Sequence, residues 1–257
     1  MPRSRNLQSG ASILKVEESL AMYLASCRKN DRNSYMISAR ESAIMQARSA
    51  PMEDKPSRLG FYCATEMGTN SSTTIEFVSN PVIASVTTQE TFEIALLAPT
   101  RSLCILTGNP LTLPTLLKRA RDCGKLCAVN IDFLDGLSRD RFAVEFLAAS
   151  GVAGVVSTRT EALKAAQTLG LMTVLRTFAI DTAAVMAAKK SLMQFRPDAV
   201  EVLPAMAAPR VGKYLQEVYP GLTMIGGGLI ETVREIEDLL HAGIKAITTS
   251  NTRLWLI

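Results

Sequence analysis

The chain carries, close to its end, Ile225-Gly226-Gly227-Gly228-Leu229-Ile230 and, one element later, Ile247-Thr248-Thr249-Ser250-Asn251. In both stretches apolar residues typical of a strand run directly into small or hydroxyl residues. Glycine lets a backbone N–H approach a ligand closely, and hydroxyl groups add further hydrogen-bond donors. In a (β/α)8 barrel the loops after strands seven and eight hold phosphate groups. The two stretches therefore predict a phosphate site at Gly227, Gly228, Thr249, Ser250 and Asn251. The alternative is that the glycines and hydroxyl residues only allow two tight turns to pack closely.

The sequence before these stretches alternates between strand-like and helix-like patterns from Pro81 onward. Such alternation is typical of a parallel sheet with crossover helices. Several of the expected strands are apolar throughout, as strands buried on both faces must be. The pattern predicts eight strands, at Val82–Val86, Ser102–Thr107, Leu126–Ile131, Val152–Ser157, Met172–Thr177, Ala199–Leu203, Thr223–Ile225 and Ala246–Thr249.

Helical patterns fill the gaps between the expected strands, among them Leu111–Asp122, Arg141–Ala149, Thr160–Leu169, Thr182–Phe195 and Thr232–Ala242. Eight strand–helix units in about 175 residues make a compact (β/α)8 barrel, since chains with this fold usually have about 250 residues. The chain also ends at Ile257, too soon for a full eighth helix. We expect an α/β fold, a compact TIM (β/α)8 barrel with a truncated eighth helix, and a doubly wound open sheet is the alternative.

The composition fits a protein that works in a reducing cytoplasm. With 257 residues and 47% apolar content the chain can bury one core and a small appendage. No apolar run approaches the ~20 residues that cross a bilayer, so no membrane association is expected. The five cysteines are an odd number and lack the spacing of a zinc site or a redox pair. We therefore expect no structural metal and no cofactor.

The first 75 residues have a different character from the rest. They are rich in Ser, Asn, Arg and Met, lack a strand pattern and end in a flexible run, Gly68–Thr74. Between residues 12 and 27 the apolar side chains fall on one helical face. We expect residues 1–75 to form an irregular extension of low order with this one amphipathic helix, and residues 76–257 to form the barrel. A helix docked on the barrel and an organelle-targeting peptide are the alternatives.

Candidate polar residues cluster at the expected strand ends. His241 is the only histidine and falls late in a helical pattern, so a Ser-His-Asp relay and a multi-histidine metal site are excluded. Asp132 follows the third strand, Arg176 lies near the end of the fifth and Glu201 lies within the sixth. A charge inside a barrel strand needs a partner. Arg176 and Glu201 are therefore either an ion pair with each other or contacts to a ligand, and Asp132 is a third candidate.

Six runs, in this order and spacing, resemble the glycerol uptake operon antiterminator regulatory family. They are NIDFLDGLSRD (130–140), GVVSTR (154–159), LRTF (175–178), DAVEVLP (198–204), GGGLI (226–230) and ITTSNTRLW (247–255). The resemblance covers the chain from about Pro81 to its end. It implies a compact TIM barrel that ends soon after strand eight. It also implies a bacterial regulator that responds to glycerol 3-phosphate and acts on leader mRNA, so that transcription passes a terminator.

The resemblance assigns roles by position. It implies that the phosphate rests on Gly227, Gly228 and the Thr249-Ser250-Asn251 loop, and that Asp132, Arg176 and Glu201 face the glycerol. Two positions depart from the family pattern. Asn130 stands where the family usually has His, and Ala205 where it usually has Gly. Asn can still form hydrogen bonds, but it cannot become a cation near neutral pH.

Charge alone gives little support for RNA binding. The net charge is +4, but residues 76–257 hold 18 basic and 17 acidic residues. Phosphate backbones favour clustered Lys and Arg. The best candidate for an RNA contact is the cluster Lys118, Arg119, Arg121 and Lys125. The alternative is that these residues form an ordinary solvated helix face.

Three functions are compatible with the sequence. The expected one is a cytoplasmic RNA-binding antiterminator whose partners are glycerol 3-phosphate and the leader mRNA of a glycerol-uptake operon. The second is a sugar-phosphate isomerase or lyase with Glu201 or Asp132 as general base. The third is a ligand sensor that acts through a protein partner. The sequence leaves the oligomeric state open, a homo-oligomer included.

Overall fold

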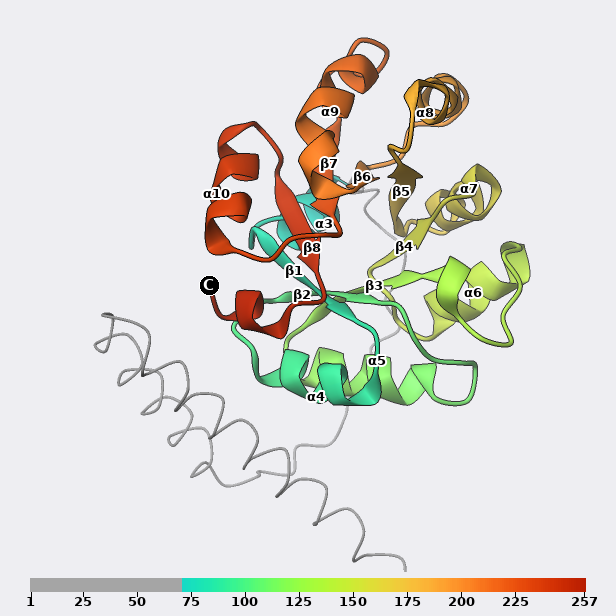
Figure 1. Cartoon of the computed structure of the whole chain (residues 1–257). Coiled ribbons are helices and arrows are strands. Elements are labelled where there is room, and N and C mark those ends of the chain that lie inside the picture. The colour runs from blue at the N-terminus through green and yellow to red at the C-terminus, as the bar shows by residue number, and fades with distance from the viewer. Residues whose placement is uncertain (1–70) are drawn as a thin grey trace, which may run out of the picture. The chain divides into compact units, whose positions relative to one another are not determined.

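The computed structural model describes residues 71–257, which form a closed barrel of eight parallel strands in chain order (Figure 1). Each strand leads through a helix or a short helical turn to the next, so that the helices surround the barrel. The strands are β1 (Val82–Val86), β2 (Ser102–Ile105), β3 (Leu126–Asn130), β4 (Gly154–Ser157), β5 (Met172–Phe178), β6 (Ala199–Leu203), β7 (Thr223–Gly227) and β8 (Ala246–Thr249).

The described part of the chain has eight α-helices and three short 3-10 helices, and seven of the α-helices follow strands. The helices that follow strands are α4 (Gln89–Leu97), α5 (Leu113–Asp122), α6 (Arg141–Ala149), α7 (Thr160–Thr168), α8 (Thr182–Gln194), α9 (Ala208–Gln216) and α10 (Val233–His241). The 3-10 helices are η1 (Ile131–Phe133), η2 (Ala205–Ala207) and η3 (Thr252–Leu256).

The predicted barrel is confirmed, and the truncated eighth helix is the 3-10 helix η3. Trp255 of η3 is fully buried, and its indole Nε1 donates a hydrogen bond to the carbonyl oxygen of Thr249 at 2.8 Å. A fully buried indole contributes a large apolar surface, and its N–H needs a partner there. The 3-10 helix η3 therefore packs against β1 and α4 on the outside of the barrel.

A helix precedes the barrel, α3 (Ser71–Phe77). The predicted flexible run Gly68–Thr74 is wrong for residues 71–74, which lie in this helix. Phe77 joins the apolar cluster inside the barrel, and its carbonyl oxygen accepts a hydrogen bond from Ser102 Oγ at 2.7 Å. These tertiary contacts stabilise a Ser/Thr-rich helix that has weak intrinsic propensity. The expected amphipathic helix at 12–27 lies outside the described residues.

Two apolar clusters hold the barrel together, one between the strands and the helices and one inside the barrel. The pairing register resolves the interior positions into layers, to each of which alternate strands contribute one residue. One layer consists of Cys104, Val156, Glu201 and Thr248, and the next toward the carboxyl ends of the strands consists of Ser85, Asn130, Arg176 and Gly227. The interior is thus apolar below and polar at its carboxyl end.

Within the described residues, no helix has the length and apolar character needed to cross a membrane.

Candidate functional site

A pocket of about 420 Å³ opens at the carboxyl end of the barrel. This volume lies in the range that holds small ligands. Six of the eight residues expected around a ligand line it, namely Arg176, Glu201, Gly228, Thr249, Ser250 and Asn251. Gly227 and Asp132 are the two that do not. The fold therefore brings the loops after β7 and β8 together with the charged residues of β5 and β6.

Arg176 and Glu201 form a buried ion pair at the floor of this pocket. Arg176 Nε donates to Glu201 Oε2 at 2.6 Å, and the two side chains are 5% and 2% exposed. Thr248 Oγ1 donates to the other oxygen, Glu201 Oε1. Burial lowers the pKa of Arg176, but the charge of Glu201 and the hydrogen bond to it outweigh burial and raise the pKa above its ordinary value. The predicted ion pair is confirmed, and the role of both residues as ligand contacts stays a prediction, which fits their place in the pocket lining.

Gly227, the last residue of β7, and Gly228, which follows it, have different structural roles. Gly227 is buried, and a Cβ there would lie 2.5 Å from Thr248 Oγ1 and 2.8 Å from Glu201 Oε1. Gly228 lines the pocket with a φ of +77°, in the left-handed region that favours glycine. Gly227 therefore makes room for the carboxylate of Glu201, whereas Gly228 lets the chain turn at the pocket wall.

The side chains of a capping box bind backbone N–H groups at the N-terminus of α10. Thr232 Oγ1 accepts from the N–H of Glu235, and Glu235 Oε2 accepts from the N–H groups of Glu231 and Thr232. These hydrogen bonds hold the pKa of Glu235 below its ordinary value, the bond from Glu231 most strongly. The N–H groups of Glu231, Thr232 and Glu235 are therefore already paired and are not free to bind an anion in the pocket.

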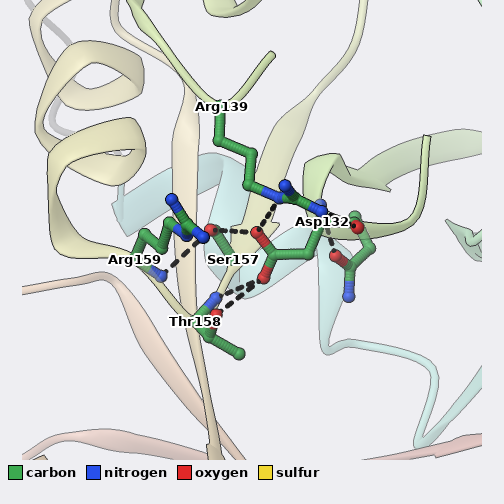
Figure 2. Close-up of polar contacts among 6 residues, drawn as sticks. Asp132, Arg139, Ser157, Thr158 and Arg159 are labelled. Atoms are coloured by element: carbon green, nitrogen blue, oxygen red, sulfur yellow. Dashed lines mark hydrogen bonds and ion pairs between the residues drawn. The ribbon is translucent and has the colours of Figure 1, made fainter. Parts of the chain in front are cut away.

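The carboxylate of Asp132 bonds to neighbouring residues and does not line the pocket (Figure 2). Its Oδ1 accepts from Ser157 Oγ at 2.9 Å, and its Oδ2 accepts from the N–H and the hydroxyl of Thr158 at 2.7 and 3.0 Å. Arg139 Nε lies 3.4 Å from Oδ1, and Arg139 Nη2 donates to the carbonyl oxygen of Asp132 at 2.7 Å. Asp132 thus connects the loop after β3 to the loop after β4.

The two departures from the family pattern lie in different environments. Asn130 is fully buried at the end of β3, and its Oδ1 accepts from the N–H of Asp132 at 3.0 Å. Ala205 is also fully buried, and its Cβ lies 3.2 Å from the place where a Cβ of Gly226 would be. The methyl group of Ala205 is accommodated because Gly226 has no side chain.

The basic cluster on α5 is largely paired within the protein. Lys118 bonds Asp122 at 2.6 Å, and Arg119 binds both oxygens of Glu93 at 2.8 and 2.6 Å. That side-chain hydrogen bond holds the pKa of Glu93 below its ordinary value. Lys125 Nζ donates to the carbonyl oxygen of Thr100 at 2.7 Å. No such hydrogen bond or ion pair is recorded, among the described residues, for the side chain of Arg121.

Several pocket residues were not among the predicted site residues. Most of them lie at strand ends or in the loops that follow, where no sequence pattern marks a residue as part of a pocket. They are Ser85, Thr87, Leu106, Leu203, Leu229, Ile230, Glu231 and Thr248. Ser85 follows an apolar run in β1 and could have been found by the rule applied to Asp132, that polar residues at strand ends face the site.

Comparison with known proteins gives a consistent result. The model of the family described as glycerol-3-phosphate responsive antiterminator matches residues 82–255. A glycerol uptake operon antiterminator-related protein from Thermotoga maritima is 31% identical, with a TM-score of 0.63 over 68% of this chain and 98% of that one. The glycerol uptake operon antiterminator regulatory protein from Listeria monocytogenes is 29% identical, with a TM-score of 0.65 over 68% of this chain and 95% of that one.

A further relative is the uncharacterized protein YgcP of Escherichia coli. It is 29% identical over 179 residues, which are 69% of this chain and 93% of YgcP. The family match spans the whole barrel from β1 to η3 and includes every strand that lines the pocket. The chain belongs to the glycerol-3-phosphate responsive antiterminator family.

Proposed function

We propose that this protein is a regulatory RNA-binding protein, an antiterminator of glycerol-utilisation genes that responds to glycerol 3-phosphate. The observation that carries the proposal is the pocket at the carboxyl end of the barrel, where a buried arginine and carboxylate meet the loops after β7 and β8. That is the place where barrels of this architecture bind phosphate groups. Membership of the glycerol-3-phosphate responsive antiterminator family supports the choice of ligand and the regulatory role.

In the proposed complex the two ends of the ligand meet different parts of the site. The phosphate rests on Gly228 after β7 and on Thr249, Ser250 and Asn251 at the end of β8. Gly227 is proposed as a further phosphate contact, although it is buried at the end of β7 and lies outside the pocket lining. Arg176 and Glu201 face the glycerol. Asp132 is proposed as a third glycerol contact, although it lies outside the pocket lining and its carboxylate oxygens already accept hydrogen bonds.

The alternative function, a sugar-phosphate isomerase or lyase, would need Glu201 or Asp132 as a general base. Each oxygen of Glu201 already accepts from Arg176 or Thr248, and each oxygen of Asp132 accepts from Ser157 or Thr158. A base must reach the proton that it abstracts, and these internal bonds compete with a substrate. The geometry therefore favours a binding protein over an enzyme.

The RNA contact has two candidate surfaces. The first is the predicted cluster Lys118, Arg119, Arg121 and Lys125, of which Lys125 precedes β3 and so lies at the end of the barrel remote from the pocket. The second lies after β4, at the same end of the barrel as the pocket, where Arg159 is exposed and has no recorded side-chain hydrogen bond or ion pair among the described residues. Exposed Phe142 in α6 offers a ring on which a base can stack, as does the face of exposed Phe133 in η1 that the Arg176 guanidinium, 5.7 Å from the ring centre, does not cover.

A gel-shift assay with the leader RNA of the organism's glycerol-uptake operon tests the function. We expect glycerol 3-phosphate to tighten RNA binding, and a salt dependence because RNA phosphates are engaged. Reversing Lys118, Arg119 and Arg121 together should weaken RNA binding if α5 is the contact surface, and Arg159→Glu should do so if the pocket side is. RNA binding that ignores the ligand, together with turnover of a triose or pentose phosphate, would establish the enzyme instead.

A further inference from the structure

The side chain of Asn130 carries a buried donor without an acceptor. Asn130 is 0% exposed, and its Nδ2 is the one buried polar side-chain atom, among residues 71–257, for which no hydrogen-bond partner is recorded. Buried donors in folded proteins nearly always have a partner, because a buried donor without a hydrogen bond destabilises the folded state. A donor that the protein leaves without a partner is open to an acceptor from outside the chain, either a ligand atom or a water molecule.

The orientation of this amide is fixed by the backbone. Asn130 Oδ1 accepts from the N–H of Asp132 at 3.0 Å, so that the side chain caps the 3-10 helix η1. Exchanging the two ends of the amide would set its N–H₂ against the N–H of Asp132, two donors facing each other. Nδ2 is thus directed away from the cap.

Asn130 shares its layer with residues that line the pocket. The register places it with Ser85, Arg176 and Gly227, and both Ser85 and Arg176 belong to the pocket lining. Asn130 itself is not part of the lining. It lies on β3, which is two strands away from β1, the strand of Ser85, and two strands away from β5, the strand of Arg176. Its donor is therefore at the depth of the pocket floor.

The floor has more donors than acceptors. Arg176 bonds Glu201 through Nε, and no hydrogen bond is recorded for its two Nη atoms within the described residues. The oxygens of Glu201 accept from Arg176 and Thr248, and those of Asp132 accept from the loop after β4. A ligand that supplies hydroxyl oxygens would satisfy the donors that these carboxylates do not.

We propose that Asn130 is a specificity-determining residue whose Nδ2 donates to a hydroxyl oxygen of a polyol phosphate in the pocket. The inference rests on the proposed function, since it takes the ligand to be glycerol 3-phosphate. It separates two tasks in the site. The loops after β7 and β8 bind the phosphate, and Asn130 with Arg176 distinguishes a hydroxylated carbon chain from a plain alkyl chain.

The test combines a change in the protein with a change in the ligand. Isothermal titration compares glycerol 3-phosphate with propyl phosphate, which keeps the phosphate and lacks both hydroxyls, in the wild type, Asn130→Ala and Asn130→Ser. We expect each substitution to weaken glycerol 3-phosphate binding about tenfold, the factor that one hydrogen bond of ordinary strength gives. Propyl phosphate binding should change by less than about twofold.

Asn109→Ala is the matched control. Asn109 lies on the loop after β2, is not part of the pocket lining, and caps its own turn by accepting from the N–H of Leu111 at 2.9 Å. Removing it deletes the same kind of cap without deleting a buried donor, so both affinities should stay at the wild-type values.

Three results would overturn the inference. The first is wild-type affinity for glycerol 3-phosphate in both Asn130 variants, which would mean that a buried water satisfies Nδ2. The second is an equal loss for both ligands. The third is wild-type protein that binds propyl phosphate as tightly as glycerol 3-phosphate, a result that requires no variant to fold. A wild type that binds neither ligand would instead contradict the proposed function itself.

Discussion

Gly227 lacks a side chain at the place where the carboxylate of Glu201 lies. A Cβ at position 227 would be 2.8 Å from Glu201 Oε1 and 2.5 Å from Thr248 Oγ1, both closer than carbon and oxygen can approach without displacement. Glu201 is also held by Arg176 on its other oxygen. The absence of a side chain at position 227 thus leaves room for a buried ion pair under the pocket.

The first prediction follows from this contact. Gly227→Ala should lower the free energy of unfolding by about 1–3 kcal/mol, because an extra methyl group in a packed interior forces its neighbours aside. Urea unfolding measures the loss. The double variant Gly227→Ala/Thr248→Ala removes the nearer oxygen and should recover part of it. Purely additive losses would show that the two positions do not interact.

The second prediction separates the conformation of Gly228 from its place in the pocket. Gly228→Val should abolish binding of glycerol 3-phosphate in isothermal titration, because φ is +77° there and a branched side chain would stand at the pocket wall. Gly170→Val is the control, since Gly170 has a φ of +72°, open space around it and no place in the pocket lining. Both variants should lose similar stability. Equal ligand affinities in the two would contradict the site.

The third prediction concerns the buried pair. Glu201→Gln should destabilise the fold by about 3–5 kcal/mol, the usual effect of leaving one charge of a buried pair uncompensated. It should also reduce the preference for glycerol 3-phosphate over inorganic phosphate while phosphate binding persists. Adding Arg176→Met removes the second charge and should restore part of the stability. Should the affinities for both ligands fall by one common factor, Glu201 has no role in recognising the glycerol.

The fourth prediction concerns the thiols. Burial first, and then the negative charge of Glu201, raise the pKa of Cys104 to about 12, and burial raises that of Cys127 to about 12 as well. At pH 8.5 iodoacetamide should therefore alkylate exposed Cys123 and leave Cys104 and Cys127 unmodified, as peptide mass spectrometry would show. Rapid labelling of Cys104 in native protein would mean that the barrel interior is open.

The same shifts give a dependence of stability on pH. The neutral thiols are favoured in the folded state, so their contribution is complete below the ordinary thiol pKa of about 9. It is lost as the pH rises from there toward 12, because only the unfolded chain then releases the protons. Unfolding free energy should fall over this window, and less so in Cys104→Ala/Cys127→Ala.

The sequence predicted the barrel because its strands are short apolar runs between helical patterns, a signal carried by local residues. It was less accurate where glycine occurs in a strand. The expected seventh strand ended at Ile225, yet β7 continues through Gly226 and Gly227. Glycine is weak evidence for a strand. Here it is needed because Ala205 packs against one glycine and Glu201 against the other, contacts that no local pattern reveals.

Candidate site residues could be predicted where their partners lie on the neighbouring strand. Arg176 and Glu201 were recognised because a charge inside a strand needs a partner, and adjacent strands supply it. Asp132 was placed beside the ligand by the same rule, but Ser157 and Thr158, some 25 residues later in the chain, occupy its carboxylate. The basic residues of α5 looked available in sequence, yet Glu93 from α4 already pairs with Arg119. Such long-range partners decide which charges are free.

The most direct test of the central claim is a calorimetric titration of glycerol 3-phosphate into the protein with and without the leader RNA, with glycerol as the comparison ligand. Ligand and RNA that favour one conformation must strengthen each other's binding by the same factor. We predict that glycerol 3-phosphate binds far more tightly than glycerol and that RNA tightens it further by about 1–3 kcal/mol. Equal binding of the two ligands, or an affinity for glycerol 3-phosphate that RNA does not change, would contradict a ligand-controlled antiterminator.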